Sequence, residues 1–188
     1  MVRETRKAIT DALLDLALEN PSRSDFSMAE IAARAGISRQ AIYQKHFRNS
    51  NEIVKYLREM TNDEVYAVFQ KYDCVSSQNP FYYFADNILP LFYENQKLLR
   101  CFFTTSIDPA GRNYIMEIYL KWGADNYRTK HSEFHLSSAA VTRMIIESTI
   151  SIVEAWICQE DPVPTEIFRT DFLRLVNTPL IDLLVVKG

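Results

Sequence analysis

Side chains that carry charge or form hydrogen bonds gather in the short stretch RQAIYQKH, at Arg39, Gln40, Tyr43, Lys45 and His46. An arginine can bond guanine through two hydrogen bonds, and a glutamine can do the same with adenine. Tyrosine, lysine and histidine suit phosphate oxygens, which position a protein on DNA without specifying sequence. The pattern predicts a short helix that contacts base edges and the DNA backbone.

Two short helices must position these side chains. The letters SMAE form a capping box, in which Ser27 caps the first helix and Glu30 reaches back to it. Gly36 can take the left-handed conformation that ends this helix, and Ser38 can cap a second helix that runs to about Lys45. Helices joined in this way form a helix-turn-helix, whose second helix lies in the major groove. The alternative is a helical hairpin with a solvated polar face.

Helical patterns continue along the rest of the chain. The 188 residues include only 4 glycines and 7 prolines, and 47% are hydrophobic, which favours long helices around a substantial core. We expect an all-α fold of about nine helices, with no strand. Pro90 is expected to kink or divide one of them. The longest predicted helices span residues 3–19, 49–72, 136–160 and the segment from Thr165 towards Val186.

From about Lys7 to Ile53 the chain resembles the DNA-binding domain of the TetR family of bacterial transcriptional regulators. The matching segments are AITDALLDLALEN, SMAEIAARAGISRQAIY, and the pair His46–Phe47 followed by Glu52–Ile53. The sequence departs from the family pattern in two places. Two residues separate Tyr43 from His46, where the family commonly has one, and Ser50 stands where the family often has a lysine.

This resemblance implies a function and a set of binding residues. It implies a helix-turn-helix DNA-binding domain at residues 1–48 and a helical effector-binding and dimerisation domain at 49–188. The expected protein is a homodimeric repressor that leaves a palindromic DNA operator when a small hydrophobic or aromatic molecule binds. The alternative is a helix-turn-helix regulator, either a repressor or an activator, whose C-terminal domain responds to a protein partner instead of a small molecule. The predicted DNA-binding residues are Ser27, Met28, Ser38, Arg39, Gln40, Tyr43, Gln44, Lys45 and His46.

The predicted helix at 136–160 is apolar on several sides, so it must be covered on several sides. The resemblance implies that the last two long helices pair with those of a second chain in a four-helix bundle. The alternative is the central helix of a monomer. The predicted dimer-interface residues are Val141, Ile145, Ser148, Ile152, Trp156, Phe172 and Leu175.

Aromatic residues are dense between residues 81 and 127. Core packing accounts for most of them, but an apolar pocket rimmed by tyrosine hydroxyls would suit a hydrophobic or aromatic small molecule. The family commonly uses this region in that way. Glu147 is either a buried polar anchor for the ligand or an exposed residue. The candidate ligand-binding residues are Phe84, Phe103, Met116, Tyr119, Trp122 and Glu147.

The charge distribution fits a DNA-binding N-terminal part. The whole chain has a net charge of -3, but residues 1–60 carry +2 and residues 61–188 carry -5. No nucleophile–base pair, glycine-rich phosphate loop or pair of carboxylates stands at a recognisable spacing, so no enzyme is expected.

Metal, redox and membrane functions are not expected. His131 and His135 flank Glu133, but no third ligand is near, and neither a metal nor any other cofactor is predicted. The apolar segment LIDLLVV is far too short to span a bilayer. The cysteines are odd in number and far apart, so we expect them to pack in the core and not to form disulfides. This pattern is typical of a reduced, cytoplasmic protein. The cysteines are Cys74, Cys101 and Cys158.

Overall fold

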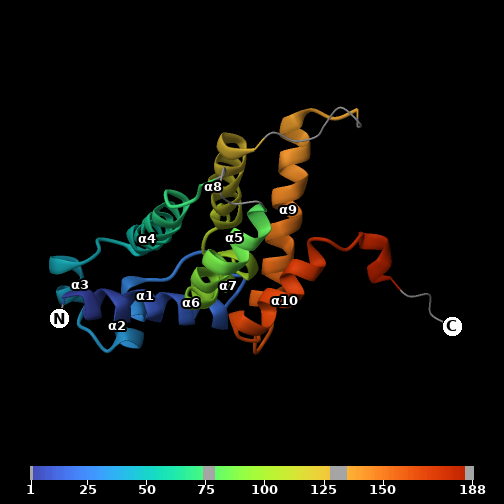
Figure 1. The fold of residues 1–188 in the computed structure, drawn as a ribbon. Helices are drawn as coiled ribbons and strands as arrows, with labels where there is room; N and C mark the ends of the chain where they lie inside the picture. The colour runs from blue at the N-terminus through green and yellow to red at the C-terminus, as the bar shows by residue number, and fades with distance from the viewer. Residues whose placement is uncertain (1, 74–78, 128–134, 185–188) are drawn as a thin grey trace. The chain divides into compact units, whose positions relative to one another are not determined.

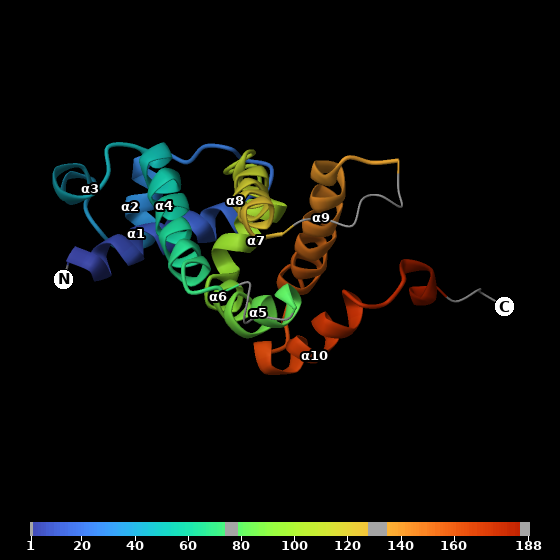
Figure 2. The same cartoon turned by 45° about the horizontal axis from the view of Figure 1, so that its top comes forward.

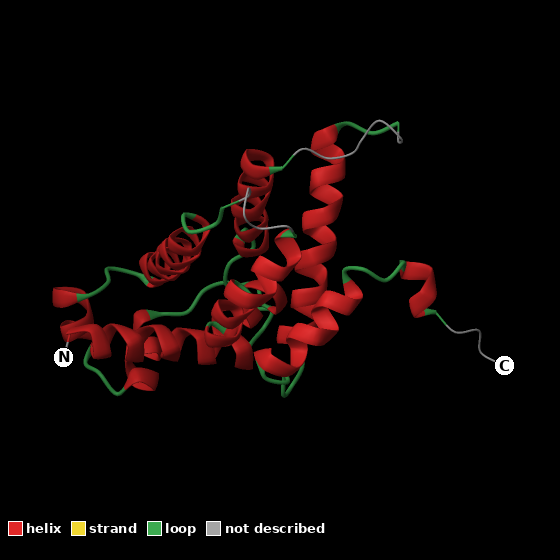
Figure 3. Ribbon diagram, viewed as in Figure 1, coloured by secondary structure: helices red, strands yellow, loops and turns green. Residues whose placement is uncertain are grey.

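The computed structural model describes residues 2–73, 79–127 and 135–184. Over these ranges it contains ten α-helices, one short 3-10 helix and no strand, which confirms the all-α prediction (Figures 1 and 3). The packing forms two compact units: unit 1 joins Met1–Glu64 with Asn95–Ile115, and unit 2 joins Val65–Glu94 with Met116–Gly188. The domain division at residue 48 concerns function and stays a prediction.

Unit 1 contains the helix-turn-helix. Helix α1 packs against α2 and α7, and α2 packs against α3; α1, α2 and α3 lie together in both views of the chain (Figures 1 and 2). Ile9, Leu13, Ile31, Ile42 and Ile53 are fully buried and form its centre. The helices are α1 (Val2–Glu19), α2 (Met28–Ala35), α3 (Arg39–Lys45), α7 (Gln96–Thr104), most of α4 (Ser50–Phe69) and the start of α8 (Gly111–Asn126).

Unit 2 has an aromatic core. Helix α10 packs against α5, α6 and α9, and α6 also packs against α9. The Trp156 ring stacks on Phe168 with centroids 4.2 Å apart, and its Nε1 donates to the carbonyl of Val163 at 2.9 Å. The helices are α5 (Pro80–Asn87), α6 (Leu89–Glu94), the rest of α8, α9 (Ser138–Ile157) and α10 (Thr165–Leu175), followed by the 3-10 helix Leu180–Leu183.

The helix boundaries agree with the sequence patterns where local capping signals exist. Helix α3 ends at Lys45 as expected, and the helix that contains Pro90 is divided, because α5 ends at Asn87 and Pro90 stands in the first turn of α6. The expected continuation of the last helix towards Val186 was wrong, because α10 ends at Leu175. Pro179 lacks an N–H, and in a continuous helix its ring would clash with the carbonyl four residues earlier.

Candidate DNA-binding surface and candidate effector cavity

The start of α2 is fixed by a complete capping box. The Ser27 hydroxyl accepts from the backbone N–H of Glu30 at 3.3 Å, while the Glu30 carboxylate accepts from the Ser27 N–H at 2.9 Å and from its hydroxyl at 2.8 Å. Arg23 forms an ion pair with Glu30 at 3.0 Å. The Arg23 guanidinium, followed by the bonds from Ser27, lowers the pKa of Glu30 to about 2. Glu30 is therefore ionised at any pH at which the protein would work.

The turn between α2 and α3 depends on glycine. Gly36 has φ +66°, and its N–H reaches the carbonyls of Ala32 and Ala33. A side chain at this position would meet no neighbour, so backbone conformation alone favours glycine here. Two residues later, the Ser38 hydroxyl caps α3 by accepting from the N–H of Ala41 at 3.2 Å.

These caps hold α3 with one buried side and one exposed side. Ile42 is fully buried and fixes the helix in the core of unit 1. The Tyr43 side chain is 51% exposed. The predicted DNA-binding residues Arg39, Gln40, Tyr43, Gln44 and Lys45 are all exposed. The structure therefore brings these five together on one short helix whose outer face is polar.

The remaining predicted DNA-binding residues have different surroundings. Ser27 and Ser38 are exposed helix caps, so their backbones are close to the surface. Met28 is buried and packs in the core of unit 1, where it offers little surface to DNA. His46 is half-buried at the end of α3.

The extra residue between Tyr43 and His46 is taken up at the C-terminal end of α3. The carbonyl of Ile42 accepts from the N–H of His46 at 2.9 Å and also from the N–H of Phe47 at 3.1 Å. The second bond spans five residues and widens the last turn. Phe47 then packs against the ring of Tyr56, with centroids 5.5 Å apart. The first turn of α3, which carries Arg39 and Gln40, lies before this widened turn.

His46 lies in a positively charged environment. Its Nδ1 has no hydrogen-bond partner among the described residues. Burial, followed by the charges of Arg6 and Lys45, lowers the pKa of His46 below the ordinary value of 6.5. At neutral pH the imidazole is therefore mainly uncharged.

Ser50 has a structural role at the position where the family often has lysine. It is buried, and its hydroxyl donates to Asp25 at 2.9 Å, which connects the start of α4 to the segment before α2. Asn49 accepts from the N–H of Glu52 at 2.9 Å, and Glu52 accepts from the N–H of Arg48 at 2.7 Å. These hydrogen bonds hold the start of α4 in place, although the lysine that the family often has here is absent.

Farther along α4, a partly buried ion pair joins the helix to the segment before α8. Both terminal oxygens of Asp108 accept from the guanidinium of Arg58, and the Asp108 side chain is only 3% exposed. The bonds to Asp108 raise the pKa of Arg58, whose guanidinium also lies 5.6 Å from the centroid of Tyr114. This pair fixes the direction of α4, the helix that follows the helix-turn-helix.

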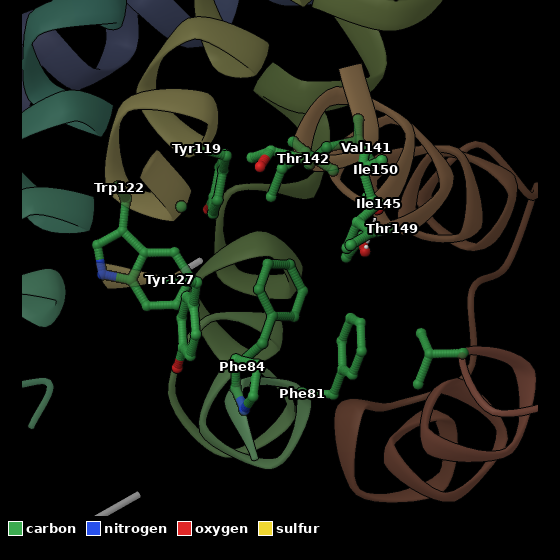
Figure 4. Close-up of a pocket in the computed structure, with 14 residues that line it drawn as sticks. Phe81, Phe84, Tyr119, Trp122, Tyr127, Val141, Thr142, Ile145, Thr149 and Ile150 are labelled. Atoms are coloured by element: carbon green, nitrogen blue, oxygen red, sulfur yellow. Dashed lines mark hydrogen bonds between the residues drawn. The ribbon is translucent and has the colours of Figure 1, made fainter. Parts of the chain in front are cut away.

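Unit 2 contains a partly open cavity of about 500 Å³, within the usual size range of small-molecule sites. Aromatic side chains from α5 and α8 form one side, and branched side chains of α9 face them (Figure 4). The described lining residues are Pro80, Phe81, Phe84, Tyr119, Trp122, Gly123, Tyr127, Val141, Thr142, Ile145, Ile146, Thr149, Ile150 and Val176.

Three of the six candidate ligand-binding residues line this cavity: Phe84, Tyr119 and Trp122. The others do not. Phe103 belongs to α7 in unit 1, Met116 is buried elsewhere on α8, and exposed Glu147 pairs with Arg143 at 3.3 Å. Helix α9 was predicted to contribute Glu147, but other side chains of this helix line the cavity. These side chains lie on one side of the helix, as their spacing in the sequence indicates. They are Val141, Thr142, Ile145, Ile146, Thr149 and Ile150.

The predicted dimer-interface residues differ in how far they are buried. Trp156 and Phe172 are buried within unit 2 and offer no free surface, while Leu175, Val141 and Ile152 are half-buried. Ser148 is exposed and Ile145 is 42% exposed. An outer face of α9 that the cavity does not use carries small or apolar side chains with helical spacing. They are Met144, Ser148, Ser151 and Ala155, and all are exposed.

Only some of the cysteine and histidine candidates lie in the described ranges. Cys101 is fully buried, and burial raises the pKa of its thiol to about 12. Across the described ranges, no group of three potential ligands could hold a metal ion; Cys74, His131 and Glu133 lie outside those ranges. Among the helices of the described chain, each is too short or too polar to cross a bilayer.

Two solved structures are similar over almost the whole chain. One is a TetR transcriptional regulator from Streptococcus agalactiae 2603V, with 19% identity and a TM-score of 0.58 over 93% of this chain and 94% of that one. The other is described as the dihydroxyacetone kinase operon activator DhaS, with 20% identity and a TM-score of 0.55 over 92% and 93%. No protein-family model and no curated protein sequence matches the chain. The resemblance seen in the sequence is confirmed in three dimensions: this chain has the fold of the TetR transcriptional regulators.

Proposed function

We propose that the protein is a transcriptional regulator without enzymatic activity, which binds a palindromic DNA operator through α3. The exposed polar face of α3 carries this proposal. Caps at Ser38 and Gly36 and the buried side chain of Ile42 hold the helix so that Arg39 and Gln40 are free to meet base edges. Tyr43 and Lys45 lie one turn farther on, where they can contact phosphates.

The regulator acts as a homodimer in this proposal. Two recognition helices must be held about 34 Å apart to enter successive major grooves, which requires a two-fold partner. The exposed face of α9 formed by Met144, Ser148, Ser151 and Ala155 supports such a contact, since small side chains allow helices to approach closely. Met144 is 56% exposed although it is a large apolar residue, and a partner helix would cover it.

The second part of the proposal is repression that a small hydrophobic or aromatic molecule relieves. The apolar cavity in unit 2 supports it, because Ile145 and its neighbours on α9 line the cavity on the helix that also carries the proposed dimer face. A ligand that fills the cavity would favour one position of α9 over another. The distance between the two recognition helices would change with it, and operator affinity would fall.

A second candidate is an activator whose C-terminal unit responds to a protein partner. Exposed apolar side chains at Ile167, Ile181 and Leu184 favour it, because a protein partner would cover them. One of the similar structures is also described as an operon activator. Operator binding that no small molecule in the cavity changes would favour this candidate over the first.

Selection of duplexes from a random DNA library tests the proposal. The wild-type chain should enrich one palindromic sequence, while the double variant Arg39→Ala/Tyr43→Ala should enrich none and keep its helical circular dichroism and its mass in solution. Enrichment of the same palindrome by the double variant would contradict the assignment of α3. Enrichment by the wild type of a sequence without two-fold symmetry would contradict the homodimer.

A further inference from the structure

Arg6, near the start of α1, is a half-buried arginine whose charge no carboxylate of the described chain neutralises. Other arginines of unit 1 are paired: Arg23 with Glu30 at 3.0 Å, and Arg34 with Glu19 at 2.6 Å. The Arg6 side chain has neither an ion pair nor a hydrogen bond among the described residues. A guanidinium keeps its charge at any working pH. The charge of Arg6 is therefore free to meet an anion from outside the chain.

Two aromatic rings hold the Arg6 guanidinium in place. Its central carbon lies 5.4 Å from the ring centroid of Tyr56 and 5.8 Å from that of Phe47, and these two rings also contact each other. Stacking on a ring uses the flat face of a guanidinium and leaves the N–H donors in its plane available. The Nε of Arg6 is buried without a partner, whereas its two terminal nitrogens remain accessible. These terminal groups form a fork that can donate two hydrogen bonds to one anion.

This cation lies beside the end of α3. Phe47 directly follows His46, the residue that caps this helix, and burial, followed by the charge of Arg6, lowers the pKa of His46. In both views the start of α1 and helix α3 lie at the same end of unit 1 (Figures 1 and 2). Helix α3 has seven residues, a length of about 10 Å, and the major groove is about 12 Å wide. When its first turn contacts bases, its end lies near the phosphates that border the groove.

We infer that the Arg6 guanidinium binds a phosphate group of the DNA backbone through its terminal N–H groups, while Phe47 and Tyr56 hold it in position. This inference rests on the proposed binding of DNA through α3. It adds a contact from α1, a helix outside the helix-turn-helix. The planar fork of arginine matches the oxygens of a phosphate. Because phosphate contacts do not read bases, this contact strengthens binding to every DNA sequence alike.

Fluorescence anisotropy with the selected palindrome and with scrambled DNA, over a salt series, tests the contact. At about 0.1 M salt, Arg6→Gln should weaken binding to both DNAs about 5- to 10-fold and reduce the salt dependence by about one phosphate. Arg6→Lys keeps the charge, so its salt dependence should stay close to that of the wild type. Wild-type affinity and salt dependence in Arg6→Gln, or a loss confined to the palindrome, would overturn the inference.

Arg100→Gln is the matched control. Arg100 is also half-buried in unit 1, but it stands on α7, where the thiol of the next residue, Cys101, donates to the carbonyl of Leu14 at 3.5 Å, farther along α1. Its DNA affinity and salt dependence should equal those of the wild type. Urea unfolding of Arg6→Gln distinguishes a packing role from a DNA contact. A loss of stability and affinity with unchanged salt dependence would assign Arg6 to packing alone and overturn the inference.

Inorganic phosphate distinguishes a phosphate of DNA from a free anion. Thermal unfolding of the full chain without DNA, in phosphate and in chloride at equal ionic strength, should give the same difference between the two salts for the wild type and Arg6→Gln. A larger stabilisation of the wild type by phosphate, together with equal DNA affinity of the two proteins, would assign a free anion to Arg6 and overturn the inference. A wild type that binds no DNA would contradict both proposals, whereas equal operator binding by the wild type and Arg6→Gln would contradict only this one.

Discussion

At the scale of single residues, Arg39 and Lys45 provide contrasting tests of DNA recognition. Both are exposed on α3, but Arg39 stands in its first turn and Lys45 at its end. Arg39→Ala should weaken binding to the selected operator about 10- to 100-fold and relax the preference at one base pair, because a bidentate base contact is lost. Lys45→Ala should weaken binding to all sequences alike and reduce the salt dependence by about one phosphate.

Fluorescence anisotropy with operator and scrambled DNA over a salt series measures both effects. Lys121→Ala is the matched control, because Lys121 is exposed on α8 and its ion pair with Asp125 at 2.8 Å lies on the same helix. Its DNA affinity should equal that of the wild type. A loss of affinity in Arg39→Ala that is the same for operator and scrambled DNA would contradict base recognition by Arg39.

His46 makes a prediction about pH. Because its pKa is lowered in the folded chain, the unfolded chain binds the proton more readily. Stability should therefore fall as the pH drops below the unfolded value of 6.5 and approaches the lowered folded value. His46→Gln removes this loss. Urea unfolding at about pH 7.5 and about pH 5 should show a larger decrease for the wild type than for the variant; parallel decreases would contradict the prediction.

At the scale of helices, the ion pair between Arg58 and Asp108 determines how α4 is held in unit 1. Arg58→Ala leaves the Asp108 carboxylate buried without its cation, so we expect a loss of about 2–4 kcal/mol in the free energy of unfolding. Arg169→Ala is the matched control, because it removes an arginine whose ion pair with Asp86 is exposed on both sides, and such pairs contribute little.

Urea denaturation followed by circular dichroism measures both arginine variants. A similarly small change in the two would contradict a structural role for the pair in α4. Double replacement of Arg58 and Asp108 by leucine should be less damaging than Arg58→Ala, since no unpaired charge remains in the core.

Helices α2 and α3 could be predicted from the sequence because their determinants are local. The serines at both caps, Glu30 and the left-handed Gly36 act within a few residues of the elements that they end. The cavity could be predicted only in part. The choice of Phe84, Tyr119 and Trp122 followed from aromatic density, but which side of α9 faces the cavity depends on how α5 and α8 pack against it. Helical spacing alone gives α9 several apolar sides, so it left Ile146 and Ile150 unassigned.

The same limitation applies to buried residues that were predicted to meet a partner. Met28 follows a cap that faces solvent, yet its own side chain packs into the core of unit 1. Trp156 and Phe172 are large and apolar, as interface residues often are, but both are buried in the aromatic core of unit 2. Residue type cannot distinguish a core that lies within one chain from a core that two chains share.

At the scale of the whole molecule, the proposed dimer is what would couple the cavity to DNA binding. Ser148→Arg places a long charged side chain in the middle of the exposed small-residue face of α9. We expect its mass in solution to fall from twice the chain mass of 21.9 kDa to that of one chain, with a large loss of operator affinity because a single half-site remains. Light scattering after size-exclusion chromatography measures the mass.

Thr104→Arg is the control for this substitution, because Thr104 is exposed on α7 and lies outside the proposed interface. It should remain a dimer. A dimeric Ser148→Arg variant would show that the outer face of α9 does not form the interface, while a monomeric wild type that still binds a palindrome tightly would contradict the homodimer itself.

The most direct test of the central claim is anisotropy titration of the wild-type chain against duplexes that tile the DNA upstream of its own gene, repeated over a salt series. The account predicts tight, salt-sensitive binding to one palindromic duplex, poor competition by random DNA, and loss of this binding in Arg39→Ala/Tyr43→Ala. Uniformly weak binding that ignores sequence, or tight binding that the double variant retains, would contradict the claim that the polar face of α3 recognises an operator.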